Sequence, residues 1–156
     1  MNSRTQKGVV GLALAIAVGG AALLLARNAS SEGVPITIYK NPSCGCCTKW
    51  AERLHKQGFD TEVRPVNNLE QIKRQVGVPS KLAACHTAEV GGYFVEGHVP
   101  AADIKRLLKE KPDNAGLTTP GMPVGSPGME VPDHAPQPYK VYAIDHQGNA
   151  QVFASH

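Results

Sequence analysis

The chain has 156 residues and a formal net charge of +3, from 16 basic and 13 acidic side chains. A charge this small, with no basic stripe interleaved with aromatic side chains, excludes a protein built to bind nucleic acid, so we expect no nucleic-acid partner. Residues 34–156 are numerous enough to form one domain that buries its own core, and no internal repeat is visible.

The N-terminal segment, residues 1–33, predicts export. Arg4 and Lys7 precede an uncharged apolar stretch, residues 8–26, which as a helix spans about 28 Å, close to the thickness of a bilayer core. Positive charge in front of such a stretch predicts a cytoplasmic N-terminus and an exported remainder. Two interpretations stay open: a cleaved signal peptide that leaves a soluble periplasmic protein, or an inner-membrane anchor followed by a polar tether. Arg27 disfavours cleavage, and the length of the apolar stretch favours the anchor.

The first predicted strand and helix enclose most of the cysteines. Val34–Tyr39 is rich in β-branched residues and predicts a strand, and Asn41–Ser43 predicts a turn with Ser43 as the helix N-cap. No Gly or Pro interrupts Thr48–Lys56, which predicts a helix. One face of this helix carries the residues expected in the core: Cys47, Trp50, Ala51 and Leu54.

The middle of the chain continues an alternating pattern once Gly58 ends the first helix. The predicted elements are a strand at 61–66, a helix that follows the cap Asn67 or Asn68 and carries Leu69, Ile72 and Val76, a hairpin of residues 81–90 and 93–96 around Gly91-Gly92, and a helix at 101–111. With the first strand and helix, this gives the order β-α-β-α-β-β-α. That order is typical of thioredoxin-like α/β folds, in which helices flank a mixed sheet.

The rest of the chain predicts a wrap and a hairpin. Residues 112–138 are rich in proline and glycine, too irregular for a helix or a central strand, so we expect this Pro/Gly-rich segment to follow a defined path over the domain surface. Residues 139–145 and 150–153 then predict a C-terminal β-hairpin around a short turn.

The cysteines are the main functional signal. Cys44, Cys46 and Cys47 occupy three of four consecutive positions, and Cys85 is followed by a histidine. Three thiols this close exceed what packing needs and indicate soft-metal binding or thiol redox chemistry. Their place at a helix N-terminus favours the thiolate, because unpaired N–H groups and the positive end of the helix dipole face them. In an oxidising compartment, metal binding is one reason for such thiols to stay reduced.

Motifs spread over the chain resemble one family. They are Cys44-Gly45-Cys46-Cys47, Ala84-Cys85-His86-Thr87, Gly92-Tyr93 with Glu96-Gly97-His98-Val99-Pro100, and Pro120-Gly121-Met122-Pro123 to Gly128-Met129-Glu130. Together they are similar to the exported bacterial metal-binding family that includes the CopG-like copper-resistance proteins. The resemblance covers nearly all of residues 34–156 and implies a thioredoxin-like fold, a periplasmic location and a role in handling copper.

The resemblance also implies ligands and partners. Cys44, Cys46, Cys47 and Cys85 are the implied metal thiolates, and His86, His98, Met122 and Met129 match nearby motif positions. The implied cargo is copper, as Cu(I) with a possible cycle to Cu(II), and an implied partner is a copper exporter or another periplasmic copper carrier. A purely structural role stays open for three of these residues. His98 would then hydrogen-bond a loop, and Met122 and Met129 would fill packing gaps under the long loop.

The chemistry of the cysteines separately favours Cu(I) over Zn²⁺. Zinc sites pair cysteines two to four residues apart, whereas Cys46 and Cys47 are adjacent. Adjacent thiolates suit the bridging of several small soft ions, and thiolate and thioether ligands select Cu(I). One Cu(I) on four thiolates leaves a charge of about −3, which several ions would neutralise. We therefore expect a polynuclear Cu(I)–thiolate site.

A thiol–disulfide oxidoreductase is the alternative from a different class. Cys44 would be its nucleophile and Cys47 its resolving thiol, at the C-x-x-C spacing of thioredoxin-like proteins. Cys46 and Cys85 argue against it, because two further thiols would scramble the disulfide. A copper oxidoreductase, in which the cysteines are both ligands and redox groups, also stays open, so the sequence leaves undecided whether the protein is an enzyme.

Overall fold

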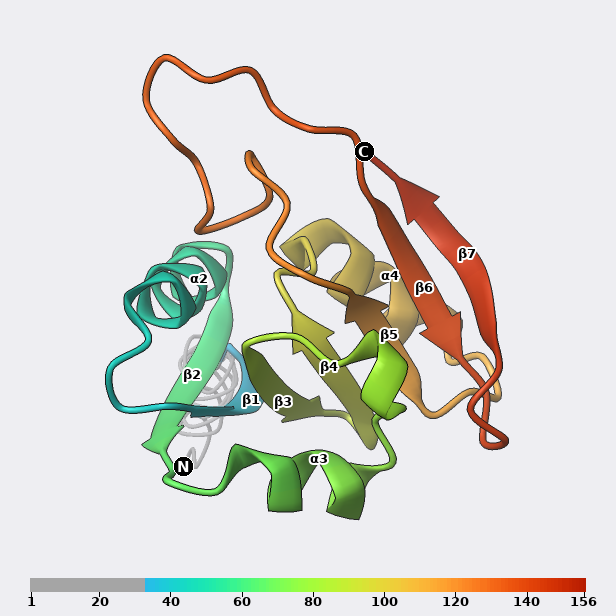
Figure 1. Ribbon diagram of the computed structural model, residues 1–156. Helices are drawn as coiled ribbons and strands as arrows, with labels where there is room; N and C mark the ends of the chain where they lie inside the picture. Colours follow the sequence, from blue (N-terminus) through green and yellow to red (C-terminus); the bar gives the residue numbers. More distant parts are fainter. Residues whose placement is uncertain (1–32) are drawn as a thin grey trace, which may run out of the picture. The chain divides into compact units, whose positions relative to one another are not determined.

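The computed structural model describes residues 33–156, which form an α/β domain around a seven-stranded mixed sheet (Figure 1). The predicted signal peptide or anchor at 1–33 lies outside the described residues except for Gly33. Among the described residues, no helix is both long and apolar enough to cross a membrane. The elements are β1 Val34–Lys40, α2 Gly45–Lys56, β2 Phe59–Pro65, α3 Leu69–Val76, β3 His86–Val90, β4 Tyr93–Gly97, α4 Ala101–Glu110, β5 Gly116–Thr119, β6 Lys140–Ile144 and β7 Ala150–Ser155.

The strands lie in the order β2-β1-β3-β4-β5-β6-β7. β1 runs parallel to β2, and β4 runs parallel to β5, each pair being joined through a helix; the other neighbours are antiparallel. The predicted α/β class, the β3–β4 hairpin and the C-terminal β6–β7 hairpin are confirmed, although the first arm of the β3–β4 hairpin begins at His86 and not at residue 81, because Ser80–Leu82 form a 3₁₀ helix.

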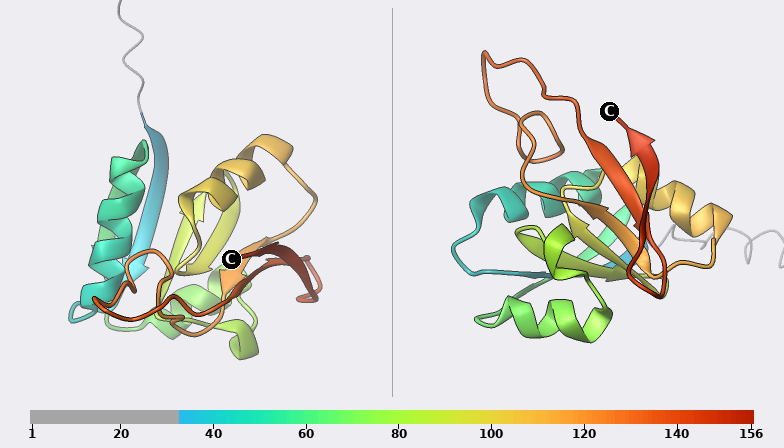
Figure 2. Two further views of the ribbon diagram at one scale, coloured as in Figure 1. Left: turned by 90° about the horizontal axis from the view of Figure 1, so that it is seen from above. Right: turned by 45° about the vertical axis from the view of Figure 1, so that its right-hand side comes forward.

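Helices cover both faces of the sheet. α2 and α4 lie on one face and α3 on the other (Figure 2). The larger core lies under α2 and α4, and the smaller one lies under α3. The four residues predicted for the buried face of α2 are all buried: Cys47, Trp50, Ala51 and Leu54. The apolar periodicity of this helix therefore fixes which way its first turn, with the cysteines, faces.

The start of α2 differs from the prediction in one respect. Ser43 is not the N-cap, because its hydroxyl and its amide both donate to Oδ1 of Asn41. Cys44 takes that position, and its sulfur accepts from the N–H of Cys47 at 3.3 Å. A cysteine sulfur thus stands where a hydroxyl or carboxylate oxygen usually caps a helix, at the positive end of the helix dipole.

The Pro/Gly-rich segment contains a strand that the sequence did not predict. β5, Gly116–Thr119, lies in the middle of the sheet, between β4 and β6, and all four of its residues are buried. The prediction that this segment holds no central strand is therefore wrong. The remainder does wrap over the domain: Gly128 approaches α2 so closely that an added Cβ would lie 2.9 Å from the amide nitrogen of Trp50 and 3.1 Å from the carbonyl oxygen of Cys46.

The C-terminal hairpin carries an irregularity. Val141 pairs with Ala154 and Tyr142 with Val152, so Phe153 is an extra residue in β7. Arg106 of α4 donates to the Phe153 carbonyl at 2.6 Å and lies over its ring, with Cζ 3.7 Å from the ring centroid. The hairpin is thereby attached to α4 as well as to β5.

Candidate metal centre

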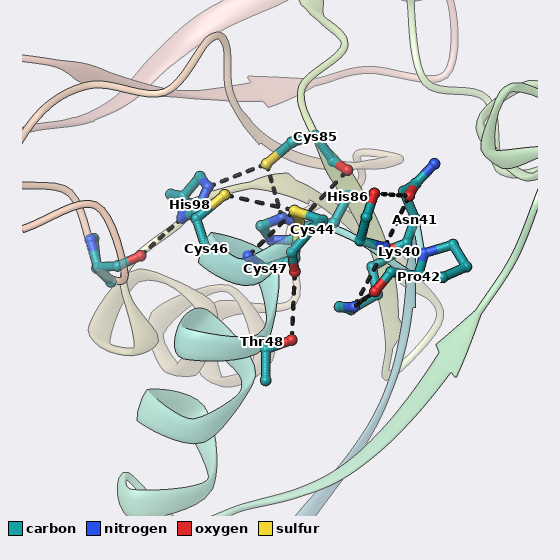
Figure 3. Close-up of a disulfide and its surroundings, with 12 residues drawn as sticks. Lys40, Asn41, Pro42, Cys44, Cys46, Cys47, Thr48, Cys85, His86 and His98 are labelled. Carbon is teal, nitrogen blue, oxygen red and sulfur yellow. Dashed lines mark hydrogen bonds between the residues drawn. A yellow bond between two sulfur atoms is a disulfide. The ribbon is translucent and has the colours of Figure 1, made fainter.

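The fold brings all four cysteines together. Their sulfur atoms lie within 4.8 Å of one another, three coming from the first turn of α2 and the fourth from the segment before β3 (Figure 3). Cys44 and Cys47 are joined by a disulfide, and Cys46 and Cys85 are free. The sulfur of Cys46 lies 3.5 Å from that of Cys44. In this form the cluster therefore holds two free thiols and one disulfide.

Two histidine rings face the thiol of Cys85. Its sulfur lies 3.2 Å from Nδ1 of His86 and 3.1 Å from Nε2 of His98, and the three groups form a second set of possible metal ligands (Figure 3). Both rings are fully buried. Cys85 thus belongs to both the four-cysteine set and the cysteine–histidine set.

A backbone carbonyl sets the tautomer of His98. Nδ1 of His98 lies 2.8 Å from the carbonyl oxygen of Pro127. Because a carbonyl oxygen only accepts hydrogen bonds, Nδ1 carries the hydrogen and Nε2 presents its lone pair toward Cys85. Metal-binding histidines in proteins are oriented in this way, through a bond from the second ring nitrogen.

Burial controls protonation at the site. It lowers the pKa of His86 well below the usual value, with His98 and Lys73 adding to the effect, and it lowers the pKa of His98 as well. Burial, with the neighbouring Cys46 thiol, raises the pKa of Cys85 to about 12. At neutral pH both imidazoles are therefore uncharged and ready to act as ligands, whereas Cys85 must lose a proton when it binds a metal.

A buried ion pair braces the chain on both sides of Cys85 and His86. Lys73 of α3 pairs with Glu96 of β4, and their side chains are 4% and 0% exposed. Glu96 also accepts from the amide of Ala84 and from the hydroxyl of Thr87, the latter at 2.7 Å. Burial raises the pKa of Glu96 against the opposing influence of Lys73. Since Ala84 and Thr87 flank the Cys85–His86 pair, Glu96 fixes the path of the chain at the site.

The Pro/Gly-rich segment closes one side of the site. Besides the Pro127 carbonyl and the contact of Gly128 with α2, Glu130 forms a salt bridge of 2.9 Å with Arg53 of α2. Met122 is 53% exposed and Met129 is half-buried in the same segment. The geometry thus joins six of the eight predicted ligands, four cysteines and two histidines, while a ligand role for the two methionines stays a prediction.

The sequence interpretation missed Lys73 and Glu96. The available signal was a charged residue at an apolar position: Lys73 lies four residues after Leu69 and three before Val76, on the stripe that was expected to be apolar.

Comparisons with known proteins show the family of the chain. A family model described as "Protein of unknown function, DUF411" matches residues 82–129, which include Cys85 and both histidines. A solved structure titled "Copper resistance protein copG", form 2, is 41% identical, with a TM-score of 0.76, and the match covers 80% of this chain and 99% of that one. The chain belongs to the CopG family.

The second CopG structure, form 1, gives nearly the same match. It is 41% identical with a TM-score of 0.75, and the match covers 80% of this chain and 98% of that one. Coverage of almost the whole CopG chain means that the likeness extends beyond the segment of the DUF411 model. No curated protein matches the chain.

Proposed function

We propose that the protein is an exported, periplasmic copper-binding protein of copper resistance that binds Cu(I) on the thiolates of Cys44, Cys46, Cys47 and Cys85. The observation that carries the proposal is the convergence of four cysteine sulfurs within 4.8 Å. Thiolates are the ligands that select Cu(I). The solved relatives are titled copper resistance protein, which supports copper as the metal.

The binding form is the one in which Cys44 and Cys47 are reduced. Opening their disulfide takes two electrons and two protons, which a dithiol supplies while forming its own disulfide. The reduced site then offers four sulfurs and two imidazoles. His86 and His98 complete the coordination beside Cys85, and Met122 and Met129 are proposed as further thioether ligands or as carriers of the ion.

The shared ligand supports a polynuclear site. Cys85 belongs to both ligand sets, and a thiolate common to two sets can bridge two ions. Four thiolates in a partly buried site also carry more negative charge than one Cu(I) neutralises, which favours several ions. The proposed cargo is therefore a Cu(I)–thiolate cluster, received from or passed to a copper exporter or another periplasmic carrier.

The test is copper stoichiometry. Full-length protein, reduced and kept anaerobic, is loaded with Cu(I) and freed of excess, and bound copper is counted per chain. We expect several ions in the wild type, a sharp fall in Cys46→Ser, and no change in Ser43→Ala, a control on the same loop. One ion per chain under excess Cu(I) would refute the cluster, and copper retention in Cys46→Ser would refute the thiolate site.

The thiol–disulfide oxidoreductase stays as a second candidate because Cys44 and Cys47 form a disulfide at the start of a helix. Cys44 is half-buried and Cys47 is fully buried, the usual relation between an attacking and a resolving thiol. The strand order β2-β1-β3-β4, with β3 antiparallel to its neighbours, supports a thioredoxin-like fold. Insulin reduction that survives both Cys46→Ser and Cys85→Ser would favour this function, and its loss would favour copper binding.

A further inference from the structure

The disulfide leaves a complete set of ligands untouched. With Cys44 and Cys47 joined, the four-thiolate site is lost, but Cys85, His86 and His98 still converge within 4.8 Å. Cys46, the other free thiol, belongs to the four-cysteine set and not to this one. The oxidised protein therefore presents one thiol and two imidazoles as a group, with the free Cys46 sulfur within 4.8 Å of the Cys85 sulfur.

The distances fit a metal ion. Zinc–sulfur bonds of about 2.3 Å and zinc–nitrogen bonds of about 2.05 Å at tetrahedral angles separate sulfur and nitrogen by about 3.5 Å. The two observed separations from the Cys85 sulfur, 3.2 Å to His86 and 3.1 Å to His98, need to open by only a few tenths of an ångström. An ion can therefore enter without a rearrangement of the strands that carry these residues.

Two further observations point to an ion. The hydrogen bond from Nδ1 of His98 to Pro127 already holds Nε2 in the orientation of a ligand. Nδ1 of His86, a fully buried ring, faces the Cys85 sulfur at 3.2 Å. The His86 ring packs on Trp50 and on the His98 ring, and this packing holds Nδ1 toward the Cys85 thiol, where it can bind the same ion as His98.

The ligand types select a divalent ion. One thiolate with two imidazoles is a borderline set that suits Zn²⁺, Co²⁺ and Cu²⁺, whereas the soft four-thiolate set suits Cu(I). Three protein ligands leave a fourth position open, as in zinc sites that keep a bound water.

We infer that the disulfide-bonded protein binds one borderline divalent ion, of the Zn²⁺ class, at Cys85, His86 and His98. The oxidation state of Cys44 and Cys47 then decides which ion the protein holds: a divalent ion on three ligands when they are joined, and copper on the thiolates when they are free. The Cu(I) half of this switch rests on the proposed function, whereas the divalent site stands on its own geometry.

The test uses Co²⁺ as a spectroscopic probe. Full-length protein is oxidised anaerobically, its two remaining thiols are counted to confirm the disulfide, and CoCl₂ is titrated in. We expect one Co²⁺ per chain, with tetrahedral d–d bands and a thiolate-to-metal charge-transfer band, and displacement by Zn²⁺. Absence of the charge-transfer band in the wild type would overturn the inference, whether or not the reduced protein binds Cu(I).

Variants assign the ligands. Cys85→Ser should abolish the charge-transfer band, and His98→Asn should weaken Co²⁺ binding by at least about 10-fold. His55→Asn, on the exposed side of α2, is the matched control and should bind as the wild type does. Cys46→Ser should keep the bands, and their loss in that variant would overturn the three-ligand assignment. Failure of Cu(I) loading with the bands intact would refute the proposed function alone.

Discussion

Breaking the ion pair between Lys73 and Glu96 is expected to destabilise the domain strongly. Lys73→Met keeps most of the side-chain volume but leaves the Glu96 carboxyl, which is fully buried, without its counter-charge. Thr87 and Ala84 remain as its only hydrogen-bond donors among the described residues. Removing one partner of a buried pair destabilises proteins by about 3–5 kcal/mol, a large share of a domain stability of about 5–15 kcal/mol.

The expected change in melting temperature follows from the size of the domain. An unfolding entropy of about 2.1 cal/mol/K per residue gives about 250 cal/mol/K for roughly 120 residues. A loss of about 3–5 kcal/mol then lowers the Tm by about 12–20 °C. We expect Lys73→Met to disturb the metal centre as well, because Glu96 holds the chain on both sides of Cys85 and His86.

The measurement is thermal and urea unfolding of the metal-free, disulfide-bonded, full-length protein, followed by circular dichroism. Two variants serve as controls. Lys73→Met with Glu96→Leu should recover most of the loss, because no unpaired charge remains. Arg64→Ala, which breaks the exposed pair with Glu62, should leave the Tm nearly unchanged. A single variant Lys73→Met that melts within a few degrees of the wild type would refute the assigned role of the pair.

Three further perturbations test the site and its supports. Gly128→Ala should lower the free energy of unfolding, measured in urea, by more than Gly121→Ala does. Both positions have a left-handed backbone, on which a Cβ costs about 1–2 kcal/mol. Only Gly128 also lies against α2, so equal losses would contradict that contact. The unfolding free energy of the metal-free protein should fall as the pH drops below about 6.5, because burial lowers the pKa of His86 and only the unfolded chain then takes up a proton there. The slope of the unfolding free energy against pH, measured by urea unfolding, should flatten in His86→Asn. An unchanged slope would argue against this assignment. The apparent Cu(I) affinity, measured by chelator competition, should rise by about 10-fold per pH unit for the proton that Cys85 releases, since the pKa of its thiol is raised to about 12. Cys85→Ser should remove that one proton from the pH dependence of the affinity. An identical pH slope in the variant would mean that Cys85 is not a ligand.

Local patterns in the sequence were sufficient where one element decides the outcome. The helical spacing of Cys47, Trp50 and Leu54 predicted the buried face of α2, and the turn before the helix predicted that the cysteines lie at a strand–helix junction. Asn68 was among the two predicted caps of α3, and its side chain accepts from the amide of Gln71. The approach of Cys85 to the other cysteines was expected only through the family resemblance, because the spacing between them does not determine how α2 meets β3.

Tertiary pairing explains what the sequence did not reveal. β5 is short, contains Gly116 and follows Pro112, so its residues resemble a loop until β4 and β6 provide hydrogen-bond partners on both sides. Lys73 becomes a core residue only because Glu96, 23 positions later, lies opposite it. The hydrogen bond of His98 to Pro127 likewise joins residues 29 positions apart, and no local periodicity encodes it.

The two edges of the sheet resist the addition of another strand by different means. β2 carries Asp60, Glu62 and Arg64 and ends at Pro65, all of which discourage a neighbouring chain from pairing there. β7 has no charged side chain and no proline. Its protection is the extra residue Phe153, which interrupts the ladder, and Arg106, which occupies the Phe153 carbonyl. The uncharged edge thus depends on one bulge and one guanidinium, and we expect the loss of Arg106 to leave the Phe153 carbonyl free to pair with a neighbouring strand.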